Sequence, residues 1–258
     1  MLQAERFLRI RSLLATFSRV SVDRIVQDLE VSRETVRRDL LELEGYGELR
    51  RVHGGAVAAG PEPEPPLSVR LIARQREKRA IAKATASLLK PGQTLFLDAG
   101  STTAILAEEI ATLSGMTVLT NSLSIALKLA GADEGRASGN AVRLLGGQID
   151  VKSQATHGDG TLEDIRRFCA DVALLSPVGL HPKHGAMSFE HHEAAVARAM
   201  AAQARQVVIL ADHSKIGQAS RVTYRRTSEI DIIVTDAKAQ ECGALAALRK
   251  DGAKVLIA

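Results

Sequence analysis

The sequence of 258 residues predicts an α/β protein in two parts: an N-terminal winged helix-turn-helix domain and a larger, mostly parallel α/β domain. Three observations predict this division. The first 58 residues show helical hydrophobic periodicity that ends in a hairpin pattern. Four of the seven prolines lie in PEPEPP, residues 61–66, a stretch that cannot continue a helix or a sheet. Further along, short apolar runs alternate with helical stretches.

The first domain, residues 1–58, contains three predicted helices and a hairpin. Residues 7–17 carry large apolar side chains at helical spacing, and Ser21 can cap a second short helix over residues 22–29. Ser32 can cap a third helix, whose predicted buried face consists of Val36, Leu40 and Leu43. LRRV and AVAA flank the turn residues HGG, which predicts a two-stranded hairpin. Three helices followed by a hairpin form a winged helix-turn-helix.

A Pro-rich linker, residues 59–74, separates this domain from the second one, residues 75–258. The second domain contains seven short apolar runs, TLFLDAG, MTVLTNS, AVRLLGG, DVALLSPVG, QVVILADHS, DIIVTDA and KVLIA. Helical stretches separate most of them, and this alternation predicts a mostly parallel sheet. Several runs end in small polar residues. In open α/β sheets the ligand crevice lies beyond the carboxyl ends of the strands.

Composition places few further limits on function. The net charge of +4 and the pI of about 9.2 permit a polyanionic partner without requiring one. Cys169 and Cys242 are far apart and have no CxxC neighbour, so they fit a reducing compartment better than a disulfide scaffold. The charged N-terminus is not a signal peptide, and no apolar run is long enough to span a membrane. We therefore expect a cytoplasmic protein.

The third helix presents a cluster of long hydrogen-bond donors beside its start. If Val36 and Leu40 face the core, the arginines of VSRETVRRDL point outward or flank the buried face, as in a helix placed in a DNA major groove. The wing residues are expected to reach phosphates. The candidate DNA-binding residues are Ser32, Arg33, Glu34, Thr35, Arg37, Arg38, Arg50, Arg51 and His53. The alternative is a solvated helical domain whose arginines pair with Glu34, Asp39 and Glu42.

The stretch DAGSTT, Asp98 to Thr103, is expected to bind a phosphate. A strand precedes it and a helix follows it, so a glycine turn, short hydroxyls and free backbone N–H groups come together. A Ser-Thr run also caps helices for purely structural reasons. Lys215 and Asn121 follow other strand ends, although a surface lysine and a turn residue are the ordinary alternatives. The candidate ligand-binding residues are Asp98, Gly100, Ser101, Thr102, Thr103, Asn121 and Lys215.

The stretch HPKHGAMSFEHHE, His181 to Glu193, holds four of the seven histidines. His and carboxylate ligands at this spacing would suit zinc or another divalent ion, but adjacent histidines on one backbone rarely point the same way. The other interpretations are a loop and helix start with solvated histidines, or groups that contact a ligand. We expect neither a metal nor a cofactor to be required.

The sequence resembles the DeoR-type bacterial transcriptional regulators. Residues 19–57 carry the resemblance in VSRETVRRDL, the following LE and a G-x-L-R-R-x-HGGA ending. EKRAIAKATASLLKPGQTLFLDAGSTT, VLTNSL, LLGG and LADHSKIG match the family's effector domain in order. The resemblance implies a DNA-binding head and a sugar-phosphate-sensing domain related to phosphosugar isomerases, with DAGSTT as the sugar-phosphate loop. Residues 176–181 depart from it, because most members carry a run that ends in Asp-Gly-Ile-Asp there.

The expected function is a regulator, a repressor of a sugar or related carbon-metabolism operon. It would bind a double-stranded DNA operator as a homo-oligomer and be released or modulated by a phosphorylated sugar, the effector. The alternative is a phosphosugar isomerase with an N-terminal extension. That enzyme needs a catalytic base, and Glu190, Glu193 and Asp212 are candidates that no motif fixes. A third interpretation uses the winged helix for protein contact.

Overall fold

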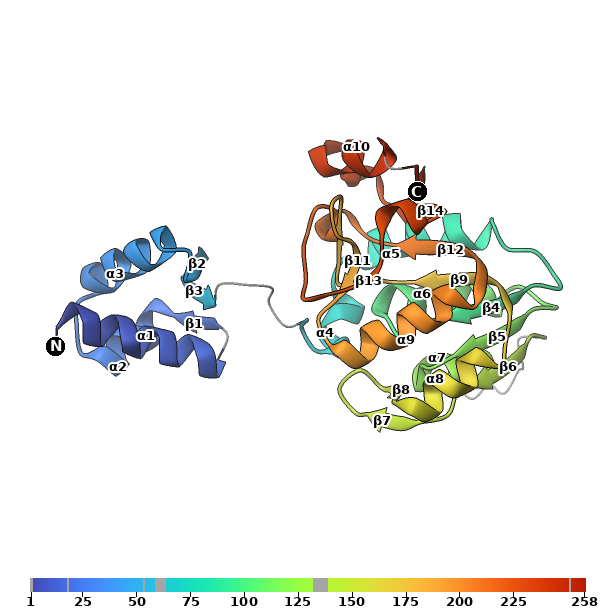
Figure 1. The fold of residues 1–258 in the computed structure, drawn as a ribbon, viewed down its shortest axis with the longest axis horizontal. Helices are drawn as coiled ribbons and strands as arrows, with labels where there is room; N and C mark the ends of the chain where they lie inside the picture. Colours follow the sequence, from blue (N-terminus) through green and yellow to red (C-terminus); the bar gives the residue numbers. More distant parts are fainter. Residues whose placement is uncertain (1, 18, 53, 59–63, 132–138, 251) are drawn as a thin grey trace. The chain divides into compact units, whose positions relative to one another are not determined.

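The computed structural model describes residues 2–17, 19–52, 54–58, 64–131, 139–250 and 252–258. The chain divides into two compact units, Met1–Pro63 and Glu64–Ala258 (Figure 1). Part of the predicted linker, residues 59–74, therefore belongs to the larger unit. This part forms the helix α4 (Leu67–Ile72), which packs against the larger unit because the side chain of Leu67 is buried there. Residues 59–63 lie outside the described residues.

The described residues of the smaller unit form a helical layer and a small antiparallel sheet. The elements in chain order are α1 (Gln3–Phe17), β1 (Arg19–Ser21), α2 (Val22–Leu29), α3 (Arg33–Gly45), β2 (Leu49–Val52) and β3 (Gly55–Ala58). The sheet order is β1-β3-β2. The predicted hairpin is β2 and β3. The strand β1 was not predicted, because three residues become a strand here only by pairing with Gly55–Val57.

Local capping starts both helices of the predicted helix-turn-helix. The Ser21 hydroxyl accepts a hydrogen bond from the Arg24 N–H at 3.2 Å, and the Ser32 hydroxyl accepts one from the Thr35 N–H at 3.1 Å. These bonds satisfy backbone donors that a helix start leaves unpaired. The predicted buried face of α3 is confirmed, since its apolar side chains pack with those of α1 and α2. The core includes Ile10, Leu14, Ile25, Leu29, Val36, Leu40 and Leu43.

A buried ion pair joins α1 to α3. The Arg6 guanidinium donates two hydrogen bonds to the Asp39 carboxylate, from Nε to Oδ2 at 2.6 Å and from Nη2 to Oδ1 at 2.9 Å. The Asp39 side chain is only 1% exposed. A bidentate pair of this kind restricts the angle at which the two helices meet, because the planar guanidinium can donate both hydrogen bonds to a carboxylate in only one relative orientation.

Asp39→Ala is expected to lower the free energy of unfolding of the smaller unit by about 1–3 kcal/mol, because it removes the buried carboxylate that accepts two hydrogen bonds from Arg6. Urea titration measures the loss, with hydrogen exchange in α1 and α3 assigning the transition. Glu42→Ala is the matched control. Glu42 accepts a bond from Gln3, also between α3 and α1, but on the exposed surface, so its loss should stay within about 0.5 kcal/mol. Equal losses would contradict the prediction.

A seven-stranded parallel sheet forms the centre of the larger unit, in the order β15-β14-β12-β9-β4-β5-β6. Its strands coincide with the seven predicted apolar runs: β4 (Thr94–Leu97), β5 (Thr117–Thr120), β6 (Ala141–Leu144), β9 (Ala170–Leu175), β12 (Ala204–Leu210), β14 (Ile232–Thr235) and β15 (Lys254–Ile257). Every adjacent pair is parallel. The predicted fold class is thereby confirmed.

Helices cover both faces of this sheet, as Figure 1 shows. One buried cluster packs beneath α5 (Gln75–Ala86), α6 (Ser101–Ala111) and α7 (Leu123–Leu129). The other packs beneath α8 (Asp159–Arg166), α9 (His191–Ala202) and α10 (Gly243–Lys250). The chain moves outward from β4 through β5 to β6 and then returns to β9 on the other side of β4. This reversal opens a crevice at the carboxyl ends of β4 and β9.

Smaller pieces of sheet border the crevice. A hairpin consists of β7 (Gln148–Asp150) and β8 (Ala155–His157), and an antiparallel sheet consists of β10 (Gly179–His181), β11 (Gly185–Ser188) and β13 (Val222–Arg225). One of the interpretations of His181–Glu193 was a loop and a helix start. The structure has a helix start there, the first turn of α9, but β10 and β11 form a β-hairpin before it. Gly185 with φ +77° closes that hairpin. No helix that the structure describes is long and apolar enough to cross a membrane.

Candidate nucleic-acid interface and candidate ligand pocket

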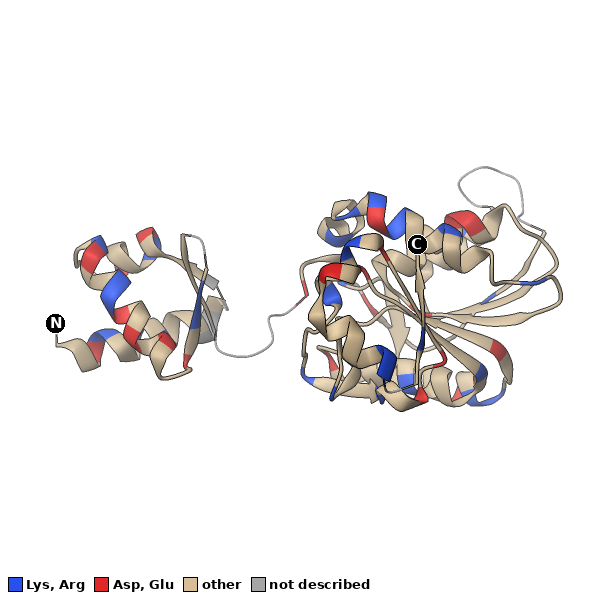
Figure 2. Cartoon of the chain, turned by 90° about the horizontal axis from the view of Figure 1, so that it is seen from above, with Lys and Arg blue, Asp and Glu red and all other residues tan. Residues whose placement is uncertain are grey.

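The outer face of α3 is polar and carries charges of both signs. Figure 2 shows basic and acidic positions interspersed on the helices of the smaller unit. Ser32, Arg33, Glu34, Arg37 and Arg38 are exposed on it. Thr35 is half-buried, and its hydroxyl lies 2.8 Å from that of Ser32. Ser32 and Thr35 therefore build the helix start, which leaves the arginines as the long donors of this surface.

The arginines of α3 differ in their partners. Arg33 pairs with Asp23 of α2, with Nη2 2.7 Å from Oδ1. The side chains of Arg37 and Arg38 form no hydrogen bond or ion pair with any residue that the structure describes. Asp39 bonds Arg6, and Glu42 bonds Gln3. Asp39 and Glu42 therefore do not pair with the arginines of α3, contrary to the alternative of a solvated helix with internal ion pairs. The guanidinium groups of Arg37 and Arg38 remain available to an anion.

The wing lies beside α3. Arg51 on β2 is held by Glu44 of α3, which accepts a bond from its backbone N–H at 2.8 Å and another from its Nε at 2.6 Å. Arg33, Arg37 and Arg51 line one groove between α3 and the wing. Arg50 is exposed on the same strand, and its side chain points to the opposite face, as successive strand residues do. His53 lies outside the described residues.

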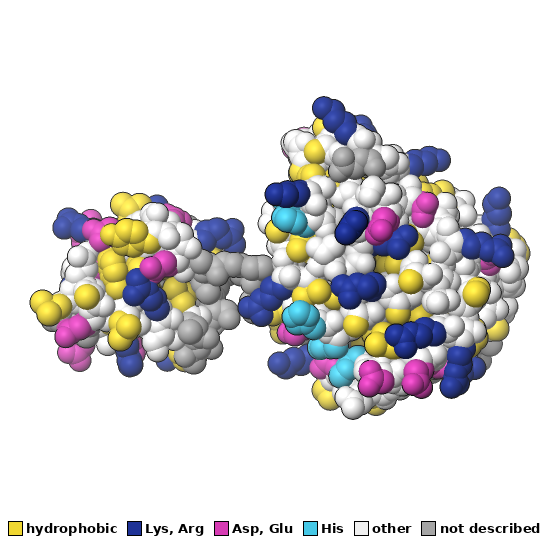
Figure 3. Space-filling model, in the orientation of Figure 1, with side chains coloured by type: hydrophobic (Ala, Val, Ile, Leu, Met, Phe, Trp, Pro, Cys, Tyr) yellow, Lys and Arg dark blue, Asp and Glu magenta, His cyan; other side chains and the backbone are white. Residues whose placement is uncertain are grey.

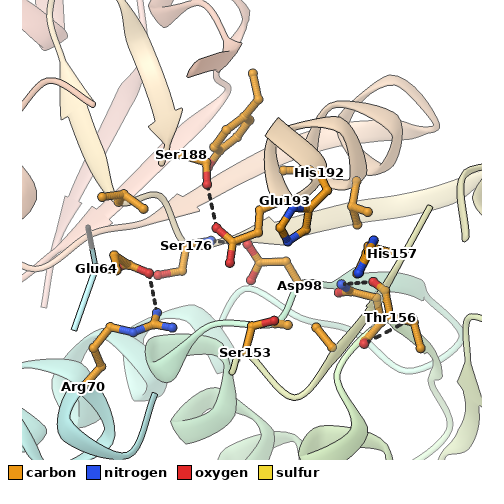
Figure 4. A pocket seen from close by; sticks show the side chains of 17 residues that line it. Glu64, Arg70, Asp98, Ser153, Thr156, His157, Ser176, Ser188, His192 and Glu193 are labelled. Carbon is orange, nitrogen blue, oxygen red and sulfur yellow. Dashed lines mark hydrogen bonds and ion pairs between the residues drawn. The ribbon is translucent and has the colours of Figure 1, made fainter. Parts of the chain in front are cut away.

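A pocket lies at the carboxyl ends of β4 and β9 in the larger unit (Figure 4). Asp98 follows β4 and Ser176 follows β9, and the Ser176 N–H donates to Asp98 Oδ2 at 2.8 Å. Asn121 follows β5 and also lines the pocket. In Figure 4, Asp98 and Glu193 point into the same space, with Glu64 to one side and His157 to the other. Two of the predicted ligand-binding residues, Asp98 and Asn121, thus line the pocket.

Ala99 also lines the pocket, and Gly100 to Thr103 build the wall beside it. The Thr103 hydroxyl accepts a bond from the Gly100 N–H at 2.9 Å and so caps α6, as the structural interpretation of the Ser-Thr run expects. The Ser101 hydroxyl accepts a bond from Lys78 Nζ at 3.0 Å. Thr102 is fully buried, and its hydroxyl has no partner among the described residues. Gly100 is needed for space, since a Cβ there would lie 3.0 Å from that of Ser176.

Lys215 lies at the edge of this wall, in the short helix η1 (His213–Lys215) after β12. Its ammonium donates to the Pro177 carbonyl and lies 3.4 Å from the Ser176 hydroxyl. Its side chain is largely buried, so the interpretation as an ordinary surface lysine does not apply. The structure therefore brings Lys215 to the same strand end as Asp98, through Ser176.

Several pocket residues were not predicted as site residues. They come from α4, the β7–β8 hairpin and β13, and include Arg70, Ser153, His157 and Tyr224. Glu193 of α9, which the sequence offered only as one of several alternatives, also lines the pocket. The stretch His181–Glu193 contributes Ser188, His192 and Glu193 to the pocket. His192 lines the pocket, where its ring centroid lies 4.5 Å from that of His157, whereas His181 stacks on His184 in the hairpin. Figure 3 shows histidine side chains beside lysines and arginines on one face of this unit.

Buried polar atoms without a partner concentrate in this pocket. Asp98 Oδ1, Asn121 Oδ1, His192 Nε2 and the Tyr224 hydroxyl are buried and have no hydrogen-bond partner among the described residues. Native proteins leave few such groups unsatisfied, and each needs an explanation. Two carboxyl or amide oxygens and an imidazole nitrogen can accept hydrogen bonds, and the phenol can donate one. The pocket is therefore suited to a small ligand with several hydroxyl groups.

Burial shifts the pKa values of the charged groups around the pocket. Burial raises the pKa of Asp98 to about 7, although the hydrogen bond from the Ser176 N–H favours its ionised form. Burial likewise raises the pKa of Glu193, although the hydrogen bond from the Ser188 hydroxyl acts to lower it. Burial, together with repulsion from Lys215, lowers the pKa of Lys78 to about 8. These shifts show that water solvates the pocket poorly.

The raised pKa of Asp98 predicts that the larger unit loses stability as the pH rises from about 4 to about 7. In this window the folded state binds more protons than the unfolded state, so the free energy of unfolding falls, by on the order of 4 kcal/mol. Asp98→Asn should remove this part of the pH dependence. Urea titrations at pH 4.5, 6 and 7.5 compare the two proteins, and parallel pH profiles would contradict the prediction.

The chain matches two family models, one for each unit. Residues 6–62 match the DeoR-like helix-turn-helix domain, and residues 73–237 match the DeoR C terminal sensor domain. Among solved structures, ribose 5-phosphate isomerase A from Neisseria gonorrhoeae is 14% identical, covering 56% of this chain and 54% of its own, with a TM-score of 0.40. That likeness carries no argument about function.

Relatives align over most of the chain. The HTH-type transcriptional repressor GlcR of Bacillus subtilis is 34% identical, over 92% of this chain and 89% of its own. The Glycerol-3-phosphate regulon repressor of Escherichia coli is 31% identical, over 92% of each chain. The HTH-type transcriptional regulator GolR of Listeria innocua is 34% identical, over 91% of each chain. The chain therefore belongs to the DeoR family of transcriptional regulators, which join a DNA-binding helix-turn-helix domain to a sensor domain for a small-molecule effector.

Proposed function

We propose that the chain is a repressor whose sensor domain binds a phosphorylated sugar or a related polyol phosphate in the pocket at the ends of β4 and β9. The unpartnered polar atoms of that pocket carry the proposal. Asp98, Asn121, His192 and Tyr224 supply acceptors and a donor that ligand hydroxyl groups can satisfy. The name of the Escherichia coli relative, a Glycerol-3-phosphate regulon repressor, supports a phosphorylated ligand.

The phosphate is proposed to lie beside the start of α6. Free backbone N–H groups at a helix start favour an anion, and Lys215 supplies a positive charge next to Ser176. The proposed effector contacts remain those predicted from the sequence: Asp98, Gly100, Ser101, Thr102, Thr103, Asn121 and Lys215. Among these hydroxyls, that of Thr102 is the one without a partner in the described residues.

The DNA contacts are proposed for the outer face of α3 and the wing. The available guanidinium groups of Arg37 and Arg38 support base contacts, and Arg50 on β2 supports phosphate contacts. The proposed set is Ser32, Arg33, Glu34, Thr35, Arg37, Arg38, Arg50, Arg51 and His53. A homo-oligomer is proposed because two heads on repeated half-sites raise both affinity and spacing specificity. Sedimentation with and without DNA tests that part.

The test of the function pairs two titrations. Calorimetry with glycerol 3-phosphate, ribose 5-phosphate and fructose 1-phosphate, each beside its unphosphorylated counterpart, identifies the ligand class. A DNA duplex that the protein selects from a random pool then reports operator binding with and without that ligand. We expect one phosphate ester to bind, its free counterpart not to bind, and the operator affinity to fall when the ester is present. Binding of none of these esters, or equal binding of a free polyol, would contradict the proposal.

A further inference from the structure

A carboxylate of the chain itself lies between two cations, one that lines the pocket and one at its wall. Glu64 lies 2.7 Å from Arg70, between Oε2 and Nη1, and 3.9 Å from Lys215, between Oε1 and Nζ. The three side chains are 18%, 15% and 13% exposed, respectively. Figure 4 shows Glu64 and Arg70 at one side of the pocket, next to Ser176. An anion held by a guanidinium and an ammonium has the charge environment in which proteins bind phosphate groups.

The two cations are fixed in place by the structure around the pocket. The Arg70 carbonyl accepts a bond from Lys78 Nζ, which also bonds Ser101 at the start of α6. Lys215 contacts Ser176, whose N–H donates to Asp98. Both residues are therefore connected to the strand ends that the effector is proposed to contact, Arg70 through its backbone carbonyl and Lys215 through its ammonium.

We propose that Arg70 and Lys215 form the cation pair that binds the effector phosphate, and that Glu64 is a built-in competitor of that phosphate. The inference rests on the proposed function. Two anions cannot share one cation pair in a poorly solvated pocket without strong repulsion. A phosphate dianion carries more charge and more acceptor oxygens than one carboxylate, so it displaces Glu64 from the pair.

The position of Glu64 in the chain connects this exchange to DNA binding. Glu64 begins the larger unit, directly after the segment that leads from the DNA-binding unit. Arg70 makes two contacts with the first residues of the larger unit. It pairs with Glu64, and its Nε donates a hydrogen bond to the Pro65 carbonyl at 2.9 Å. Phosphate on Arg70 removes the first contact and competes for the second. The effector would then bind the state in which Glu64 has left Arg70 more tightly than the state in which the two are paired. Allosteric coupling requires such a difference in affinity between two states.

The test is Glu64→Gln, which removes the charge and keeps the size. Inorganic phosphate and the sugar phosphate panel are titrated by calorimetry at constant ionic strength. We expect Glu64→Gln to bind inorganic phosphate about tenfold more tightly than the wild type, and Arg70→Ala to lose that binding. Glu163→Gln, at an exposed position on α8, makes the same charge change elsewhere and should leave the affinity unchanged.

The outcomes separate this inference from the proposed function. Wild-type affinity for phosphate in Glu64→Gln, while a sugar phosphate still binds, would overturn the competition and leave the proposed function intact. Tighter inorganic phosphate binding with no sugar phosphate binding would support the competition and contradict the proposed ligand class. Glu64→Gln should also shift operator affinity in the direction in which the effector shifts that of the wild type. An unshifted operator affinity would overturn the link to DNA binding.

Discussion

Replacing Arg38 with alanine is expected to lower the affinity for operator DNA by about 1–3 kcal/mol, roughly 5- to 150-fold, and to relax the base preference at one or two positions. Arg38 is exposed on the outer face of α3 and pairs with none of the described residues. Its guanidinium can therefore reach a base edge without first breaking an ion pair. Arg33 lacks this advantage, because it would have to leave Asp23.

The measurement is fluorescence anisotropy with a duplex that the wild type selects from a random pool, at two salt concentrations. Arg166→Ala on α8 removes the same charge from an exposed position of the other unit and should leave DNA binding unchanged. Arg50→Ala should weaken binding to all sequences alike and reduce the salt slope by about 1, as loss of a phosphate contact does. Wild-type affinity in Arg38→Ala at both salt concentrations would contradict the placement of α3 in the groove.

The features that could be predicted from the sequence are those that depend on residues close together in the chain. Ser21 and Ser32 could be assigned as helix caps because a cap bonds an N–H two or three residues away. The seven strands could be assigned because each is a short apolar run between helical stretches. The strand β1 could not, since Arg19–Ser21 acquires its structure from pairing with residues more than thirty positions later. The same limit hid the Arg6–Asp39 pair, whose partners are 33 positions apart.

The pocket residues also divide into those that a local pattern predicts and those that only tertiary packing brings to the pocket. Asp98 and Asn121 could be found because each follows a strand, and the carboxyl ends of parallel strands meet at one edge of a sheet. Glu64, Arg70 and His192 reach this edge from segments packed around the sheet, and no local pattern reports that packing. Residues 64–66 belong to PEPEPP, where the prolines indicated a linker and gave no sign that Glu64 pairs with Arg70.

Lys215→Ala is expected to lower the affinity for the phosphorylated effector by about 1.5–3 kcal/mol, roughly ten- to hundredfold, because it removes a charged donor from the proposed phosphate site. Binding of the operator without effector should persist, because Lys215 belongs to the larger unit. Lys215→Met separates charge from packing, since methionine keeps an apolar stem where the lysine stem is buried. Both variants should lose the same affinity if the charge is responsible.

Calorimetry with the effector, paired with the operator titration, checks this expectation, and Lys183→Ala at an exposed position is the control. The comparison with Glu64→Gln makes the result more specific. If Lys215 binds phosphate directly and Glu64 competes for it, the two variants must change the effector affinity in opposite directions. Loss of affinity in both would mean that Glu64 and Lys215 merely hold the pocket in shape. Unchanged affinity in Lys215→Ala would place the phosphate elsewhere, because a largely buried ammonium cannot lie beside a bound dianion without affecting its binding.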